Sequence, residues 1–178
     1  FLLPCSVFAA ATDAQMISAV KSGNIKVIKD LLGQGLDVNI KDKSGTPVLL
    51  LAASGGKYAA AELLLNEGAN AKAADSRGNT ILHLLSSSSR KEAAVLMKTA
   101  INKGADINAL NFKSPRQTPA EIAVSRGNIP VLELLMSSGV EADDTFGNKP
   151  MAVYAYDAGQ IKTMKFIIEK GADIDTEN

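Results

Sequence analysis

Side chains that could catalyse a reaction are scarce in this sequence. Its 178 residues include one histidine, His83, and one cysteine, Cys5. His83 stands just before the serine run at positions 86–89, and a serine activated by a histidine base is an arrangement that hydrolases use. Such a pair also needs an orienting acid, and nothing in the sequence specifies that geometry. We therefore interpret His83 as structural and the serines as a polar connection, assign no catalytic residue, and keep a hydrolase using His83 as an alternative.

Metal and cofactor sites are not expected either. A single cysteine excludes a cysteine-based zinc cluster and an internal disulfide, and the sequence contains no glycine-rich phosphate loop and no calcium-binding loop. Acidic residues recur instead where turns are expected, because an aspartate side chain can bond to the backbone N–H groups just ahead of it. These residues are Asp42, Asp75, Asp106, Asp144 and Asp173.

The overall composition excludes several classes of protein. Nineteen basic residues balance nineteen acidic ones, which argues against a nucleic-acid partner, because such proteins are usually basic. Hydrophobic residues make up 46% of the chain, enough for a core and too many for a disordered protein. No apolar stretch approaches the roughly 20 residues that a membrane-spanning helix needs, so we expect no transmembrane segment.

The chain is built from a repeated unit. Similar apolar runs end at glycines spaced 32 to 36 residues apart, namely Gly35, Gly68, Gly104, Gly139 and Gly171. Asp-x-x-Gly turns precede short apolar segments, for which Thr80 and Thr118 are natural N-caps, while Pro119 and Pro150 fit the first helical position. Each unit is thus predicted to be a turn plus two antiparallel helices. Helices this short are unstable alone, so neighbouring units must stack, and the predicted fold class is all-α.

These repeats resemble those of the ankyrin-repeat family. That family has a period of about 33 residues and a Thr-Pro-Leu-His motif, to which Thr80-Ile81-Leu82-His83 and Thr118-Pro119-Ala120 are similar. The resemblance implies a solenoid of about five helix-turn-helix units with β-turn fingers. We place the repeat domain at 12–178, with units at about 12–41, 42–74, 75–110, 111–142 and 143–178.

Several units depart from the common pattern. Thr46-Pro47 comes one residue early relative to the preceding glycine, so we expect the cap of that helix to differ. The third unit has extra residues at 86–91, which predict a longer connection between its two helices. The fourth unit has a longer finger, 111–117, without the Asp-x-x-Gly turn.

The first eleven residues, 1–11, are uncharged and end in small residues. An apolar stretch followed by Ala-x-Ala is typical of the end of a secretory signal peptide, and the alternative is a short apolar lid on the first unit. The first interpretation predicts a periplasmic or exported protein and the second allows a cytoplasmic one.

Stacked units present an extended surface that such proteins use for binding. By resemblance to ankyrins, that surface consists of the finger tips and the exposed side of the first helices. Arginine and aromatic side chains are enriched among residues that dominate binding, and Phe112 and Phe146 have no evident structural role if they stand at exposed tips. The predicted partner-binding residues are Lys43, Arg77, Asn79, Phe112, Lys113, Arg116, Gln117, Arg126, Phe146, Asn148, Tyr156 and Asp157.

These observations predict a non-enzymatic protein-interaction module, monomeric by itself. The predicted binding residues on the fingers include the basic side chains Lys43, Arg77, Lys113 and Arg116, which predict an acidic patch on the protein partner. Exported bacterial ankyrin proteins that resemble this one include immunity proteins that neutralise secreted toxins such as lipases, so the resemblance implies a periplasmic immunity protein. An intracellular scaffold or adaptor is the alternative.

Overall fold

A computed structural model of the chain describes residues 12–173. The expectations for residues 1–11 therefore lie outside the described residues. Across residues 12–173 the chain forms ten helices and one short hairpin. The elements are α1 (Asp13–Ser22), α2 (Ile25–Gly33), α3 (Val48–Ser54), α4 (Tyr58–Asn66), α5 (Ile81–Ser86), α6 (Lys91–Asn102), α7 (Pro119–Arg126), α8 (Ile129–Ser137), β1 (Thr145–Phe146), β2 (Lys149–Pro150), α9 (Met151–Asp157) and α10 (Ile161–Glu169).

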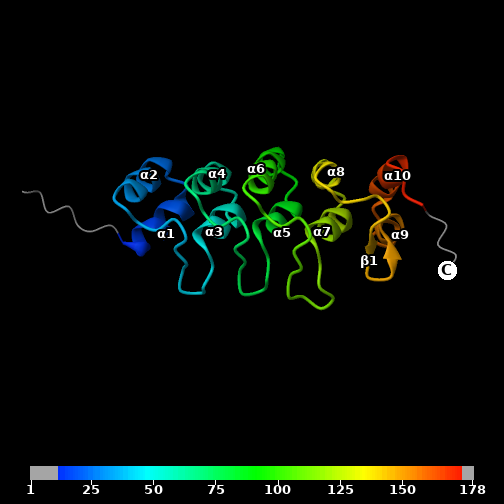
Figure 1. Ribbon diagram of the computed structural model, residues 1–178, viewed down its shortest axis with the longest axis horizontal. Helices are drawn as coiled ribbons and strands as arrows, with labels where there is room; N and C mark the ends of the chain where they lie inside the picture. The colour runs from blue at the N-terminus through cyan, green and yellow to red at the C-terminus, as the bar shows by residue number, and fades with distance from the viewer. Residues whose placement is uncertain (1–11, 174–178) are drawn as a thin grey trace, which may run out of the picture.

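The helices form five consecutive pairs, which we number units one to five from α1–α2 to α9–α10. The first helix of each pair lies in one row and the second in another, and the fingers that join successive pairs all project to the same side (Figure 1). Unit five carries the antiparallel β1–β2 hairpin as its finger, with Phe146 opposite Lys149. The predicted all-α solenoid of helix-turn-helix units is confirmed. No helix within residues 12–173 has the length and apolar character needed to cross a bilayer.

Several first helices begin with a reciprocal cap that the sequence specifies locally. Thr12, Thr80 and Thr118 are the N-caps of α1, α5 and α7, and in each case the side chain three residues later accepts a hydrogen bond from the N-cap N–H. Pro119 occupies the first helical position, as expected. Pro150 does not: its backbone is extended, with ψ 145°, because it still belongs to the hairpin, and α9 begins one residue later.

The fingers are held together by one side chain at their base. In unit two the Oδ1 atom of Asp42 accepts hydrogen bonds from the N–H groups of Ser44 and Thr46, at 2.9 and 3.0 Å. Asp75 does the same for the finger of unit three. The finger of unit four lacks an aspartate, and its fully buried Asn111 accepts from the N–H groups of Lys113 and Gln117 instead. The longer finger therefore keeps the same internal support.

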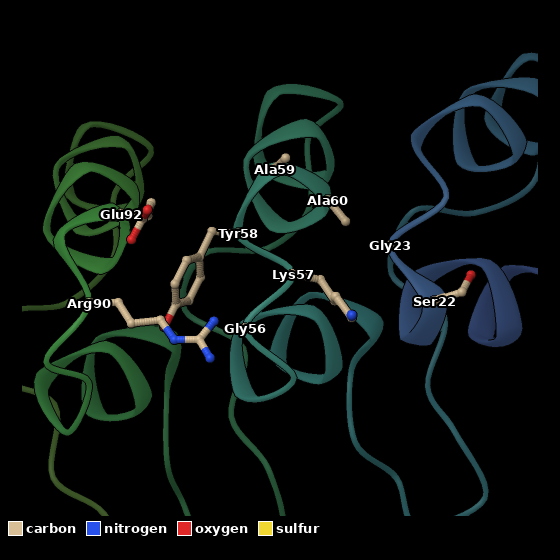
Figure 2. A pocket seen from close by; sticks show the side chains of 9 residues that line it. All are labelled: Ser22, Gly23, Gly56, Lys57, Tyr58, Ala59, Ala60, Arg90 and Glu92. Atoms are coloured by element: carbon tan, nitrogen blue, oxygen red, sulfur yellow. The ribbon is translucent and has the colours of Figure 1, made fainter.

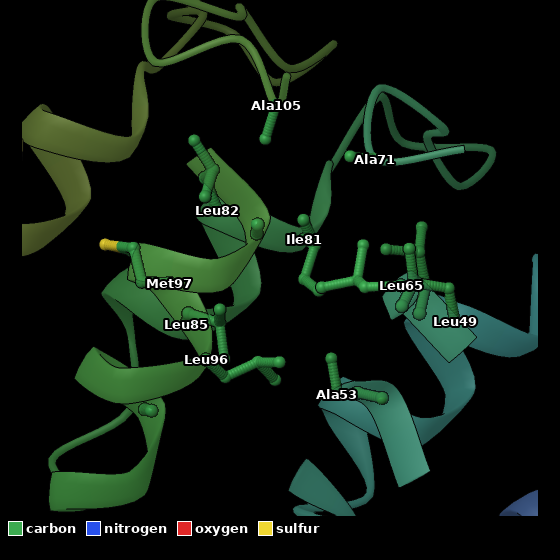
Figure 3. Close-up of a cluster of buried hydrophobic side chains, with 14 of the residues drawn as sticks. Leu49, Ala53, Leu65, Ala71, Ile81, Leu82, Leu85, Leu96, Met97 and Ala105 are labelled. Carbon is green, nitrogen blue, oxygen red and sulfur yellow. The ribbon is translucent and has the colours of Figure 1, made fainter. Parts of the chain in front are cut away.

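The hydrophobic core is continuous from one unit to the next. Figure 3 shows Leu49, Ala53 and Leu65 of unit two facing Ile81 and Leu96 of unit three, all of them buried. Burying one such leucine or isoleucine contributes about 1.5–3 kcal/mol, more than a helix of nine residues can supply by itself. Stacking therefore stabilises the solenoid, as the sequence predicts.

A second set of contacts joins the units at the turns between paired helices, on the side away from the fingers. The side chain of Lys57 lies over Gly23, and the guanidinium of Arg90 lies over Gly56 (Figure 2). The aliphatic stem of Lys57 thus packs at the end of α1, and the Arg90 guanidinium reaches the C-terminal end of α3, where positive charge is favourable. Gly56 has a φ of 66°, which favours glycine, and a Cβ atom there would stand 2.9 Å from the Arg90 guanidinium and displace it.

Amide side chains make the corresponding contacts in units four and five. Asn128 donates from Nδ2 to the carbonyl oxygens of Ser86 and Ser88, at 3.1 and 2.7 Å. Gln160 donates from Nε2 to the carbonyl oxygen of Ser125. The longer connection predicted in unit three is present between α5 and α6, and the carbonyl of Ser88 within it accepts a hydrogen bond from the Asn128 side chain. The serine run therefore has a structural role.

Candidate functional site

Two grooves lie between the fingers and the first helices of units three, four and five. The first, of about 520 Å³, separates the fingers of units three and four. Finger residues form one side of it and residues of α5 and α7 form the other. Its lining residues are Arg77, Asn79, His83, Leu84, Ser87, Lys113, Gln117, Ile122, Ser125 and Arg126.

The second groove, of about 680 Å³, separates the fingers of units four and five. Its lining includes aromatic and aliphatic surface as well as charged groups. The residues are Pro115, Arg116, Gln117, Glu121, Phe146, Gly147, Asn148, Lys149, Tyr154, Asp157 and Ala158. Gln117 lines both grooves, so the two meet at the base of the finger of unit four. We call the pair the finger grooves.

The finger grooves carry an excess of positive charge. Arg77, Lys113 and Arg126 line the first groove, and no aspartate or glutamate is among its described lining residues. These three side chains and Arg116 form no ion pair within residues 12–173. In the second groove Lys149 is paired with Asp157. Four cations are therefore available to an outside ligand on the surface of a chain whose net charge is zero.

His83 supports the floor of the first groove. It is 2% exposed, and its Nδ1 lies 3.1 Å from the Thr80 nitrogen, whose N–H can only donate. Nδ1 is thus the acceptor, and Nε2 carries the proton that it donates to the carbonyl oxygen of Gln117 at 2.9 Å. Burial lowers the pKa of His83, although the carbonyl of Gln117 and the charge of Asp75 act in the opposite direction. A neutral His83 therefore joins unit three to unit four.

These contacts give His83 a structural role, and the hydroxyl nearest its ring is that of Thr80, whose Oγ1 lies 2.9 Å from Nδ1. Both ring nitrogens of His83 are engaged with Thr80 and Gln117, and within residues 12–173 neither is bonded to a serine hydroxyl. The Ser86 hydroxyl is buried without a hydrogen-bond partner in this part of the chain. A catalytic pair needs direct contact between nucleophile and base, and no serine supplies it here.

Most of the predicted partner-binding residues meet in the finger grooves, with one clear error. Phe146 was expected at an exposed tip, but it is 8% exposed and packs edge-on against Tyr154, with ring centroids 5.3 Å apart. Neighbouring strand residues point to opposite sides, so Thr145 faces outward and Phe146 faces α9. Asn79 is half-buried, because its amide binds Asp75 and Asn111. The residues predicted to bind a partner that line the grooves are Arg77, Asn79, Lys113, Arg116, Gln117, Arg126, Phe146, Asn148 and Asp157, with Phe146 buried rather than at a tip.

Three predicted residues lie outside the finger grooves. Lys43 is exposed on the finger of unit two, and Tyr156 is 61% exposed on α9. Phe112 is 68% exposed, yet it has a structural contact: its ring and nitrogen lie within 2.9 Å of where a Cβ at Gly78 would stand. Phe112 also donates from its N–H to the carbonyl of Arg77 at 2.7 Å, which links the fingers of units three and four.

The sequence interpretation missed other groove residues, above all Pro115, Lys149 and Tyr154. Tyr154 precedes Asp157 by three positions on α9, and this spacing places both on one face of the helix. That spacing was available from the sequence. The position of Pro115 was not, because it depends on the path of the longer finger.

A further pocket, of about 630 Å³, lies at the turns between the paired helices of units one to three (Figure 2). Its cations, Lys57 and Arg90, are the side chains that pack over Gly23 and Gly56. Inter-unit packing therefore already explains their position. No group of three or more metal-ligating side chains occurs in the described part of the chain.

Comparison with known proteins agrees with this architecture. The family model for ankyrin repeats (three copies) matches residues 16–111 and again 95–178. The chain is 31% identical over 163 residues to the nuclear factor NF-kappa-B p105 subunit of Gallus gallus, covering 90% of this chain and 16% of that protein. It thus spans about a sixth of that relative. The crystal structure of the human ASB11 ankyrin repeat domain superimposes with a TM-score of 0.74 at 24% identity, covering 90% of this chain and 70% of that one.

Proposed function

Because this chain belongs to the ankyrin-repeat family, whose domains generally mediate protein–protein interactions, we propose that it is a non-enzymatic module that binds a protein partner through the finger grooves. One observation carries the proposal: Arg77, Lys113 and Arg126 converge on one groove without a carboxylate partner within residues 12–173. Positive side chains that repel one another are not needed for stacking, so their convergence is explained by a ligand of opposite charge.

The finger grooves are also supported by hydrogen bonds within the chain itself. Asp75 and Asn111 fix the fingers, and the bond from His83 to Gln117 fixes the base between them. A preformed surface loses little conformational entropy on association, so more of the interaction energy appears as affinity. Exposed charges are screened by salt, and the association is therefore expected to weaken as ionic strength rises.

The test is capture of partners from the native source with a charge-reversed variant and a matched control. The variant changes the four groove cations, Arg77, Lys113, Arg116 and Arg126, to glutamate. The control makes the same change at exposed lysines of the second helices, Lys26, Lys29, Lys98 and Lys162. We expect the wild type and the control to capture the same protein and the groove variant to lose it. Equal capture by all three would refute the proposal.

The narrower proposal is a monomeric, exported immunity protein that neutralises a secreted toxin such as a lipase effector. The uncharged residues 1–11, ending in small residues, and the resemblance stated above support it. Mass spectrometry of the native N-terminus tests export, since cleavage would leave a chain starting near residues 10–13. Inhibition of toxin activity by the purified chain tests the immunity role. Residues 1–11 still attached in the native protein would contradict export. Toxin activity that the purified chain does not diminish would contradict the immunity role.

An intracellular scaffold or adaptor is the second candidate, favoured by the likeness to a subunit of a nuclear factor. It requires the same grooves but predicts that residues 1–11 remain attached. The same mass measurement therefore distinguishes the two settings.

A further inference from the structure

We infer that the two finger grooves together hold one extended segment of the protein partner, with an acidic side chain in the first groove and an aromatic or aliphatic side chain in the second. This inference rests on the proposed function and adds the chemistry and form of the bound segment. It follows from the different character of the two grooves and from the residue where they meet.

The first groove fits a carboxylate. Arg77 approaches from the finger of unit three, Lys113 from the finger of unit four, and Arg126 from the end of α7. Arginine presents paired N–H groups that match the two oxygens of a carboxylate, and hydrogen bonds between charged groups are the stronger kind. The polar side chains around them, Ser87 and Ser125, donate to carbonyls of their own helices and add no charge.

The second groove fits an apolar side chain. Phe146 and Tyr154 pack edge-on, so each ring restrains the other, and Pro115 and Ala158 complete the apolar part of the lining. Three of the charged groups beside them are occupied, because Lys149 binds Asp157 and Glu121 accepts from the N–H of Thr118. The fourth, Arg116, forms no ion pair within residues 12–173 and is exposed on the finger of unit four. An aromatic or aliphatic side chain can therefore bury surface here without displacing a polar partner.

Gln117 lines both grooves and is the residue that a segment passing from one groove to the other would contact. Its backbone carbonyl accepts from His83 and from the N–H of Asn111, which fixes the residue in place. Its half-buried side-chain amide forms no hydrogen bond within residues 12–173. An amide offers both a donor and an acceptor, as one peptide unit of an extended chain requires. The segment thus crosses Gln117 by its backbone and places neighbouring side chains in the grooves on either side.

The test measures binding of dye-labelled peptide pools to the full chain by fluorescence polarisation. The peptides have about eight residues, roughly 27 Å when extended, which allows one chain to pass through both grooves. One pool combines an acidic with an aromatic residue, a second has only the acid, a third only the aromatic, and a fourth combines a basic with an aromatic residue. We expect the first pool to bind most tightly and the fourth most weakly.

Substitutions then assign each side chain to its groove. Arg126→Ala is expected to weaken binding of the acidic–aromatic pool about tenfold, because one charged hydrogen-bond donor is lost. Ala158→Leu, which fills the second groove, should remove the advantage of the aromatic residue and leave the acid-only pool unaffected. Lys98→Ala, an exposed lysine on α6, is the matched control and should bind as the wild type does. Thermal unfolding of each variant verifies that it is folded.

Two kinds of result would overturn the inference. If no pool binds, or if the basic pool binds as well as the acidic one, the grooves do not hold an acidic extended segment. If the groove cations are nevertheless needed to capture the native partner, the proposed function stands and the partner presents a folded surface instead. If no peptide pool binds and capture of the native partner does not depend on the groove cations, both proposals are refuted.

Discussion

Replacing His83 tests the physical link between units three and four. His83→Ala removes the acceptor for the Thr80 N–H and the donor to the Gln117 carbonyl, two bonds of 3.1 and 2.9 Å around a residue that is 2% exposed. His83→Gln is the informative companion, because Gln15 at the same position of α1 accepts from the N–H of Thr12. We expect glutamine to keep the cap and to lose the link to Gln117.

The magnitude follows from the groups left without partners. In His83→Ala the buried Thr80 N–H loses its acceptor, at a cost of about 1–3 kcal/mol, and the second bond contributes about 1 kcal/mol. The Gln117 carbonyl still accepts from the N–H of Asn111, so it is not fully unsatisfied. The expected loss of unfolding free energy is about 2–4 kcal/mol for alanine and about 1–2 kcal/mol for glutamine.

Urea unfolding followed by circular dichroism measures these differences, with Lys98→Ala as the exposed control. An unfolding free energy of His83→Ala within about 0.5 kcal/mol of wild type would refute the structural role, since surface changes lie in that range. Loss of a hydrolytic activity at unchanged stability would instead favour the hydrolase.

Three further perturbations follow from buried polar groups. Burial lowers the pKa of His83 below 6.5, so the unfolded chain binds the proton more readily than the folded chain does. The stabilisation that His83 contributes is therefore complete above about pH 6.5 and declines at lower pH. The difference in unfolding free energy between wild type and His83→Gln should accordingly narrow from about pH 7.5 to about pH 5. A gap that widens would contradict this sign. Asn111→Leu leaves two finger N–H groups unpaired and should lower the unfolding free energy by about 2–4 kcal/mol, with Asn111→Asp, which retains the acceptor, losing much less in the same urea titration. Ser86→Ala removes a buried hydroxyl that has no partner in the described part of the chain, so the melting temperature should rise, and a fall would show that the hydroxyl is bonded.

The sequence predicted those parts of the fold that depend on local chemistry. Thr118 and Pro119 specify the start of α7, and the structure confirms the N-cap and the first helical position predicted for them. Each short helix also carried the apolar residues needed for stacking, so the solenoid followed from the period. Pro150 was misplaced by one residue because hairpin pairing with Thr145, a contact outside the local sequence, keeps its backbone extended.

The candidate site was less predictable, because exposure depends on tertiary contacts that the repeat pattern does not specify. Phe146 occupies a finger, and its burial depends on Tyr154 eight residues later. Asn111 illustrates the opposite case: it stands where aspartates support the other fingers, and an asparagine Oδ1 can accept the same two bonds. That substitution was visible in the sequence, whereas the meeting of Arg77, Lys113 and Arg126 in one groove required the stacked units.

Under the proposed function, stability and binding are coupled through one residue, Gln117. The carbonyl of Gln117 receives the bond from His83 that joins units three and four, while its side-chain amide lies where the two grooves meet. A change at His83 is expected to act on the groove through Gln117, and a change at Arg126 on the proposed ligand directly. Arg126 is exposed and forms no ion pair within residues 12–173, so its removal should affect affinity at constant stability. Removal of His83 should lower both, because the surface that binds the partner is formed only while the two units remain stacked.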